Sequence, residues 1–193
     1  MSLLNTPLCD FGWKAPDFTL PDPDGTRFTM SEQIGENGLL IAFICNHCPY
    51  IKAIGDRLAG DADLLIENGI NVLAVMSNDF HDYDADSPEN MKLFSKHYEF
   101  KFPYLVDETQ EVGKAYNAVC TPDFFGLNKD GQLQYRGRLD DVGMSGSDAS
   151  SRVPELVLCC RLQRRAKDRA TSRQAWGAAS NGANSKNVID LIN

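Results

Sequence analysis

The chain has 193 residues, of which 42% are hydrophobic and 24% are charged, a composition ordinary for a soluble globular protein of one domain. Its net charge of −8 argues against nucleic acid or an anionic membrane as a partner. Because we find neither a membrane-spanning apolar stretch nor a secretion signal in the first 16 residues, we expect a cytoplasmic protein.

The N-terminal half begins with short elements and continues with a strand and a helix. Alternating apolar residues around Asp24-Gly25 predict a tight hairpin. Leu39–Ile44 is apolar on both faces, as expected of a central parallel strand. Apolar residues at helical spacing then predict a helix that ends near Asn68-Gly69 and carries Pro49 in its first turn.

The second half alternates strands and helices. Ile70–Met76 is a second buried strand, and Ser87-Pro88 opens a helix that runs to about Tyr98. The remaining predicted elements are a strand at 102–106, a short helix at 108–116 and a hairpin formed by 124–127 and 133–135. This order predicts an α/β sandwich with a central mixed sheet flanked by helices.

The composition changes from about Leu156 onward. Six basic residues crowd into positions 161–173, against the single acid Asp168, and the residues that follow show no apolar period. We therefore predict a domain at 1–155 and an atypical basic, low-complexity tail at 156–193.

The most informative motif is Cys45-Asn46-His47-Cys48, directly after the first buried strand. We expect Cys45 at the entrance of the following helix, where unpaired N–H groups and the helix dipole favour a thiolate. Cys48, about one turn later, can then close a disulfide with Cys45. The six cysteines are too irregularly spaced for a disulfide scaffold, so the motif indicates a redox-active dithiol.

A strand that ends in Cys-x-x-Cys, followed later by Thr121-Pro122, resembles the thioredoxin-like superfamily. The opening Ala15-Pro16-Asp17-Phe18-x-Leu20 is similar to its alkyl hydroperoxide reductase and thiol-specific antioxidant branch. Cys45–Tyr50 together with Cys120–Asp123 is similar to a group of bacterial thioredoxin-like proteins in that branch. The resemblance covers roughly residues 12 to 155 and implies a thioredoxin-like sandwich.

The resemblance also implies roles. Cys45 would attack a protein or small-molecule disulfide, Cys48 would resolve the mixed disulfide, and an external reductase system would supply electrons without a cofactor or metal. Pro122 would be a cis-proline, and the backbone of Thr121 would bind an extended substrate. The roles of two further residues stay open. His47 either adds a hydrogen-bond donor or a cation beside Cys45 or is merely exposed. Cys120 either approaches the dithiol or is a buried hydrophobic residue.

Two other functions stay open. A thiol peroxidase of the same fold ranks second, because peroxiredoxins place Thr or Ser three residues before the reactive cysteine. Here Ala42 precedes Cys45 by three residues, and Cys45 precedes Cys48 by three residues, so neither cysteine has that hydroxyl. A redox-inert binding module is the other alternative. The general base that would deprotonate the resolving thiol is unidentified, since Leu39–Ile44 holds no carboxylate.

A metal site is not expected. Zinc could find ligands in Cys45, His47, Cys48 and Cys120, but the adjacent His47 and Cys48 are poorly placed to join Cys45 at one tetrahedral centre. An acidic segment after the second buried strand is expected to be a solvated loop, with a weak divalent-cation site as the alternative; it contains Asp79, His81, Asp82, Asp84 and Asp86.

A frameshift near residue 157 is our hypothesis for the basic tail. The related proteins end in a segment resembling Ser-Met-Gly-Cys-Ser-Ile-Lys-Trp, which is absent here. The codons for residues 173–181 can be read in a shifted frame that starts at the third base of each codon. The peptides that this frame can encode include Ala-Ser-Met-Gly-Cys-Ser-Ile-Lys-Trp. The nucleotide sequence tests this hypothesis, under which Cys159 and Cys160 carry no chemistry.

Overall fold

The computed structural model describes residues 10–137 and 139, which lie in the first of the two units into which the chain divides, Met1–Cys160. The predicted tail at 156–193 lies outside the described residues, so its boundary at 155 stays a prediction. None of the helices in the described part is long and apolar enough to cross a bilayer.

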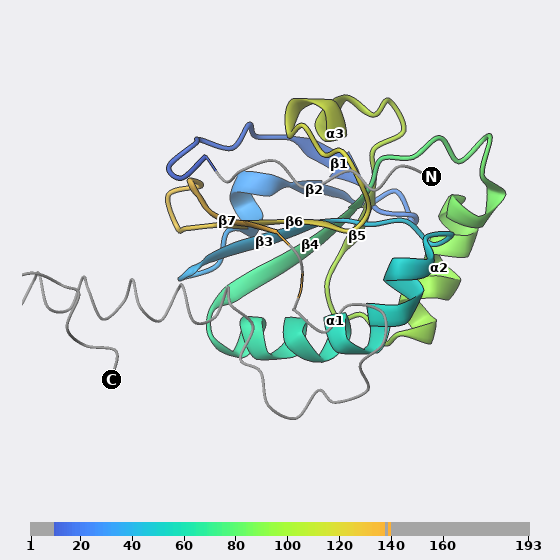
Figure 1. Ribbon diagram of the computed structural model, residues 1–193, viewed down its shortest axis with the longest axis horizontal. Helices are drawn as coiled ribbons and strands as arrows, with labels where there is room; N and C mark the ends of the chain where they lie inside the picture. Colours follow the sequence, from blue (N-terminus) through green and yellow to red (C-terminus); the bar gives the residue numbers. More distant parts are fainter. Residues whose placement is uncertain (1–9, 138, 140–193) are drawn as a thin grey trace, which may run out of the picture. The chain divides into compact units, whose positions relative to one another are not determined.

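The centre of the domain is a five-stranded sheet in the order β5-β4-β3-β6-β7 (Figure 1). Strands β4 and β5 run parallel to β3, whereas β6 pairs antiparallel with β3 and with β7, so the sheet is mixed as predicted. The strands are β3 (Gly38–Phe43), β4 (Ile70–Met76), β5 (Tyr104–Val106), β6 (Asp123–Leu127) and β7 (Leu133–Gly137).

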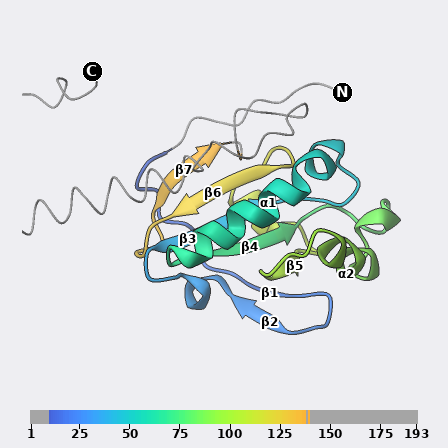
Figure 2. The same ribbon diagram turned by 90° about the horizontal axis from the view of Figure 1, so that it is seen from below.

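Helices cover both faces of this sheet (Figures 1 and 2). Helices α1 (Pro49–Glu67) and α2 (Pro88–His97) pack on one face, and α3 (Glu111–Ala115) packs on the other. A separate hairpin of β1 (Thr19–Pro21) and β2 (Arg27–Thr29) lies on the α3 side, and the 3₁₀ helices η1 (Met30–Gln33) and η2 (Asp84–Asp86) complete the described elements.

The sequence of β3 explains the two hydrophobic layers. Successive side chains of a strand point to opposite faces, so Leu40 and Ala42 join the core beneath α1, while Leu39, Ile41 and Phe43 join the core on the α3 side. Every residue of β3 is buried. A continuous apolar run is therefore required here, and it positions the cysteines at the end of a rigid central strand.

Helix α3 is shorter than the predicted 108–116. Gln110 precedes it with a left-handed φ of 60°, and Asn117 follows it with a φ of 50°. These two residues interrupt the helical backbone on both sides. The remaining predicted strands and helices are present with small shifts at their ends.

Candidate active site

Three loops meet at the end of β3. Strand β6 runs antiparallel to β3 with Phe43 opposite Asp123, so the Thr121-Pro122 step before β6 lies beside the residues that follow Phe43. Strand β4 runs parallel to β3 and ends at Met76, so the next loop begins at the same edge of the sheet. Parallel strands place ligand sites at their carboxyl ends for this reason.

The two cysteines of the motif are free thiols in contact with Thr121. The Cys45 Sγ lies 3.2 Å from Thr121 Oγ1, and the Cys48 Sγ lies 3.3 Å from the Thr121 carbonyl oxygen. The Thr121-Pro122 peptide bond is cis, as the sequence predicted. Both residues are buried, with Cys45 1% exposed and Cys48 7% exposed.

The predicted position of Cys45 at the helix start is wrong. Helix α1 begins at Pro49, and Cys48 is its N-cap residue. Pro49 sits at the first helical position, where it fits well, because its missing N–H would have no partner in the helix and its φ is already helical. The four-residue motif therefore forms the loop before the helix, and the helix N-terminus stabilises negative charge on Cys48 rather than on Cys45.

The pKa values of the two thiols move in opposite directions. A hydrogen bond from the Cys45 thiol lowers the pKa of Cys48 to about 5, with further help from the backbone N–H groups of Ile51 and Tyr50. The same hydrogen bond raises the pKa of Cys45, as do its burial and the nearby carboxylate of Asp86. Cys48 is therefore the more acidic thiol of the pair.

A buried carboxylate, Asp86, organises the dithiol loop. Its Oδ1 accepts hydrogen bonds from the backbone N–H groups of Asn46 at 2.7 Å and His47 at 3.1 Å. Its Oδ2 accepts from His47 Nδ1 at 2.6 Å and from Asn78 Nδ2 at 3.3 Å. Asp86 is 0% exposed, and these four donors compensate for the burial of its charge.

His47 links Asp86 to the dithiol. Its Nδ1 must carry a proton to donate to the Asp86 carboxylate, so a neutral ring presents the Nε2 lone pair to Cys45, whose Sγ is 3.9 Å away. Tyr83 stacks on the other side of the imidazole with ring centroids 4.7 Å apart. The sequence left His47 open between a donor or cation beside Cys45 and a merely exposed residue, whereas this arrangement orients it as a proton acceptor.

Sequence reasoning missed Asp86. It predicted a solvated acidic loop after the second buried strand, and for Asp86 that prediction is wrong. The available signal was topological, because a loop that follows β4 emerges at the same sheet edge as the loop that follows β3. One carboxylate among several in that loop could therefore reach the dithiol.

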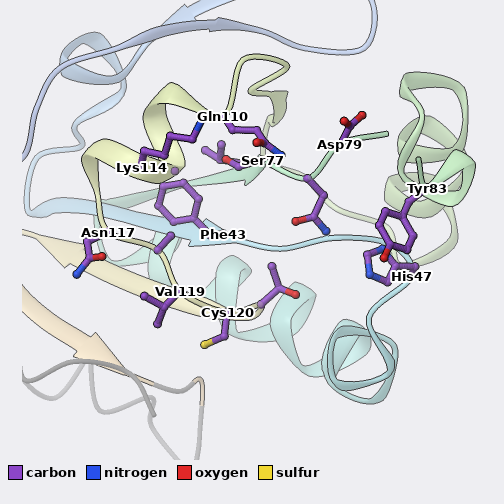
Figure 3. A pocket seen from close by; sticks show the side chains of 15 residues that line it. Phe43, His47, Ser77, Asp79, Tyr83, Gln110, Lys114, Asn117, Val119 and Cys120 are labelled. Carbon is purple, nitrogen blue, oxygen red and sulfur yellow. The ribbon is translucent and has the colours of Figure 1, made fainter. Parts of the chain in front are cut away.

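Cys120 lies near the dithiol but is not part of it. Its side chain is partly exposed, and its Sγ lies 3.8 Å from the carbonyl oxygen of Pro122. Figure 3 shows the sulfur turned away from His47. The structure thus brings Thr121 and His47 to the sulfur of Cys45, and it places Cys120 on the adjoining wall.

Among the described residues, Cys45, His47 and Asp86 have possible metal-ligand atoms within 4.8 Å of one another. Cys48 and Cys120, which the sequence offered as further ligands, do not belong to this cluster. Both Asp86 oxygens and His47 Nδ1 are engaged in hydrogen bonds, which leaves the Cys45 sulfur and His47 Nε2, fewer than the four ligands of a structural zinc site. The arrangement fits a hydrogen-bonded proton relay better than a metal centre.

A cavity of about 700 Å³ opens beside the dithiol (Figure 3). His47, Thr121 and Cys120 form the part nearest the sulfurs. The segment after β4 and the residues on and around α3 form the rest of its walls. A substrate in this cavity would reach the residues that touch both sulfurs.

Comparison with known proteins agrees with this geometry. Residues 11–136 match the AhpC/TSA family. The chain is 26% identical over 132 residues to the thiol-disulfide oxidoreductase ResA of Bacillus thuringiensis subsp. konkukian, covering 64% of this chain and 67% of the relative. It is 26% identical over 117 residues to the peroxiredoxin Bcp of Escherichia coli K12, covering 61% of this chain and 70% of the relative.

A solved structure of a conserved protein from Geobacillus kaustophilus is also similar. It shares 39% sequence identity with a TM-score of 0.73, covering 77% of this chain and 79% of the other. A thiol:disulfide interchange protein DsbE from Chlorobium tepidum, described in its title as putative, shares the fold at 19% identity and a TM-score of 0.58. The predicted thioredoxin-like fold and the predicted branch are confirmed.

Proposed function

This chain belongs to the AhpC/TSA family, and from that membership and the geometry of its two thiols we propose that it is a thiol–disulfide oxidoreductase. One observation carries the proposal. Cys45 and Cys48 both contact Thr121 at a cis-proline loop, one at its hydroxyl and the other at its carbonyl oxygen, beside an open cavity. The names of its relatives, a thiol-disulfide oxidoreductase and a peroxiredoxin, support an oxidoreductase of this kind.

The proposed mechanism reverses the sequence-based order of attack. Cys48 has the lower pKa, so its thiolate attacks one sulfur of a substrate disulfide. A mixed disulfide forms between Cys48 and that sulfur, and the other half of the substrate leaves as a thiolate.

Cys45 then resolves the mixed disulfide. His47 Nε2, oriented by Asp86, accepts the Cys45 proton, and the new thiolate attacks the Cys48 sulfur. The Cys45–Cys48 disulfide forms, and the second half of the substrate leaves with the proton. Two electrons have passed from the protein dithiol to the substrate disulfide.

The remaining parts of the proposal concern cellular context. The substrates are protein or small-molecule disulfides and thiols, and an external reductase system returns the protein disulfide to the dithiol. The cytoplasmic location remains a prediction of the sequence, whereas the reductive direction of the cycle is part of the present proposal.

Single-cysteine variants test the order of attack. We expect Cys45→Ser to accumulate a mixed disulfide with a small aromatic disulfide, because Cys48 attacks and nothing resolves it. Cys48→Ser should react far more slowly, while Cys9→Ser serves as a matched control for loss of a thiol. Mass spectrometry and the rate of insulin reduction measure both outcomes. Trapping by Cys48→Ser alone would restore the order predicted from sequence, and equal insulin reduction by all variants would remove the proposed function.

A second candidate function, thiol peroxidase, is favoured by Thr121. The sequence lacks a hydroxyl three residues before either cysteine, but Thr121 Oγ1 supplies one from a distant loop, 3.2 Å from Cys45 Sγ. A peroxide would convert one thiolate to a sulfenic acid with release of an alcohol or water, and the other thiol would then form the disulfide with loss of water. Rapid peroxide consumption with a trappable sulfenic acid, both lost in Thr121→Val, would establish this activity. A pair that never oxidises reversibly would instead indicate a redox-inert binding module.

A further inference from the structure

Three polar side chains that line the cavity have no partner among the described residues. Gln110, Lys114 and Asn117 line the cavity, on α3 and at the residues that flank it. Across residues 10–137, these three side chains form no hydrogen bond or ion pair, although the backbone of Asn117 accepts from Arg136. Polar groups grouped in this way are available to a ligand.

The backbone conformation on both sides of α3 supports a ligand-binding role for these three polar side chains. The described chain contains three non-glycine residues with a left-handed φ, and two of them, Gln110 and Asn117, line this cavity. A left-handed backbone is unfavourable for a side chain such as that of Gln110, and such strain concentrates at binding sites.

Opposite charges lie at opposite ends of the cavity (Figure 3). Lys114 and Gln110 gather at one end, and Asp79, Tyr83 and His47 lie at the other. Lys114 is the only lysine or arginine among the described lining residues, in a protein whose net charge is −8. In an acidic protein, a lysine without an ion pair can bind a ligand carboxylate and favour anionic ligands over neutral ones.

We propose that this cavity binds one arm of a small peptide disulfide that carries carboxylate groups. The inference rests on the proposed function and specifies its substrate class. A ligand carboxylate pairs with Lys114, its peptide amides hydrogen-bond to Gln110 and Asn117, and its sulfur lies near Thr121. The volume of about 700 Å³ falls within the range for small-molecule sites and accommodates a short peptide.

The redox balance is that of the proposed mechanism. The protein dithiol loses two electrons and becomes the Cys45–Cys48 disulfide. The bound peptide disulfide gains them and leaves as two peptide thiols. The reverse reaction lets the same peptide thiol serve as the reductant of the protein.

Binding can be tested without redox chemistry. The probe is S-methylglutathione, an anionic peptide thioether that cannot exchange, titrated by calorimetry into the Cys45→Ser/Cys48→Ser variant. We expect saturable binding that Lys114→Ala weakens about two- to fivefold, since Lys114 is exposed and an ion pair at an exposed lysine is lost. Lys129→Ala removes an equal charge at the exposed turn between β6 and β7 and should leave affinity unchanged. Absence of binding, or an equal effect of both lysine variants, would overturn the inference.

Kinetics with disulfides of different charge give a second readout. Glutathione disulfide is anionic, hydroxyethyl disulfide is neutral and cystamine is cationic. We expect Lys114→Ala to lower the kcat/KM ratio of the anionic to the neutral substrate about two- to fivefold, and Lys114→Glu to shift preference toward cystamine. Lys129→Ala should keep the wild-type ratio.

The two proposals fail in different ways. A wild-type protein that reduces all three disulfides without regard to charge keeps the proposed function and loses this inference. A protein that binds S-methylglutathione but reduces none of the disulfides loses the proposed function.

Discussion

Asp86 holds the dithiol loop through its backbone and its histidine at once. Its carboxylate accepts the N–H groups of Asn46 and His47 and also fixes the ring of His47. Asn46 adds to the same attachment, because its Nδ2 donates to the carbonyl oxygen of Ala85 at 2.8 Å and its Oδ1 accepts from Tyr104 at 3.2 Å. Because η2 holds the dithiol loop on one side and β5 holds it on the other, both sulfurs keep their positions next to Thr121.

Asp86→Asn separates the two chemical steps. The amide keeps the shape but turns a donor toward His47 Nδ1, so the neutral ring must carry its proton on Nε2 and can no longer accept one from Cys45. We expect release of product from the mixed disulfide to slow about 10- to 100-fold, with a smaller change in the first attack. Rapid-quench single-turnover kinetics measure both steps. Asp82→Asn, the same change at an exposed position in the same loop, is the control, and wild-type resolution in Asp86→Asn would contradict the role given to His47.

At the level of the elements, the apolar runs of β3 and β4 were predictable because burial on both faces demands them. The thiol motif was predictable because it is a short local pattern, whereas the cis-proline was implied by the resemblance to the thioredoxin-like superfamily. The start of α1 was not, since periodicity locates the middle of a helix but leaves its first turn ambiguous. The role of Asp86 could not be predicted for a different reason. Its burial depends on how the loop after β4 folds over the loop after β3.

Helix α1 offers a matched pair of glycines for a stability test. A Cβ at Gly55 would come within 2.3 Å of the Tyr98 ring, whereas a Cβ at Gly60 would meet nothing within 4 Å. Tyr98 is held in place by its hydroxyl, which donates to the carbonyl oxygen of Lys52 at 3.1 Å.

We expect Gly55→Ala to lower the free energy of unfolding by about 1–2 kcal/mol, because overpacking against Tyr98 outweighs the gain in helix propensity. Gly60→Ala should raise it by about 0.5–1 kcal/mol through propensity alone. Urea denaturation followed by circular dichroism measures both changes. Equal stabilisation by the two substitutions would show that Tyr98 does not pack against α1 as described.

For the whole molecule, the asymmetric titration of the thiols couples redox state to stability. In the proposed mechanism the reduced folded protein carries a Cys48 thiolate at neutral pH, whereas the unfolded chain, with a thiol pKa of 9.0, does not. The oxidised protein has no such thiolate. The reduced form therefore gains a pH-dependent stabilisation that the disulfide form lacks, which makes the protein disulfide the better oxidant.

The sign of this dependence follows from the direction of the shift. Because folding lowers the pKa of Cys48 to about 5, the stabilisation is complete only above pH 9 and disappears as pH falls through 5. We expect the difference in Tm between the reduced and oxidised proteins to grow in favour of the reduced form from pH 5 to about pH 8. Differential scanning calorimetry with and without a phosphine reductant measures it, and the Cys45→Ser/Cys48→Ser variant should show no such dependence on the reductant. A difference that stays constant across this range, or shrinks with rising pH, would mean that no thiolate is stabilised at the start of α1, and the proposed order of attack would lose its physical basis.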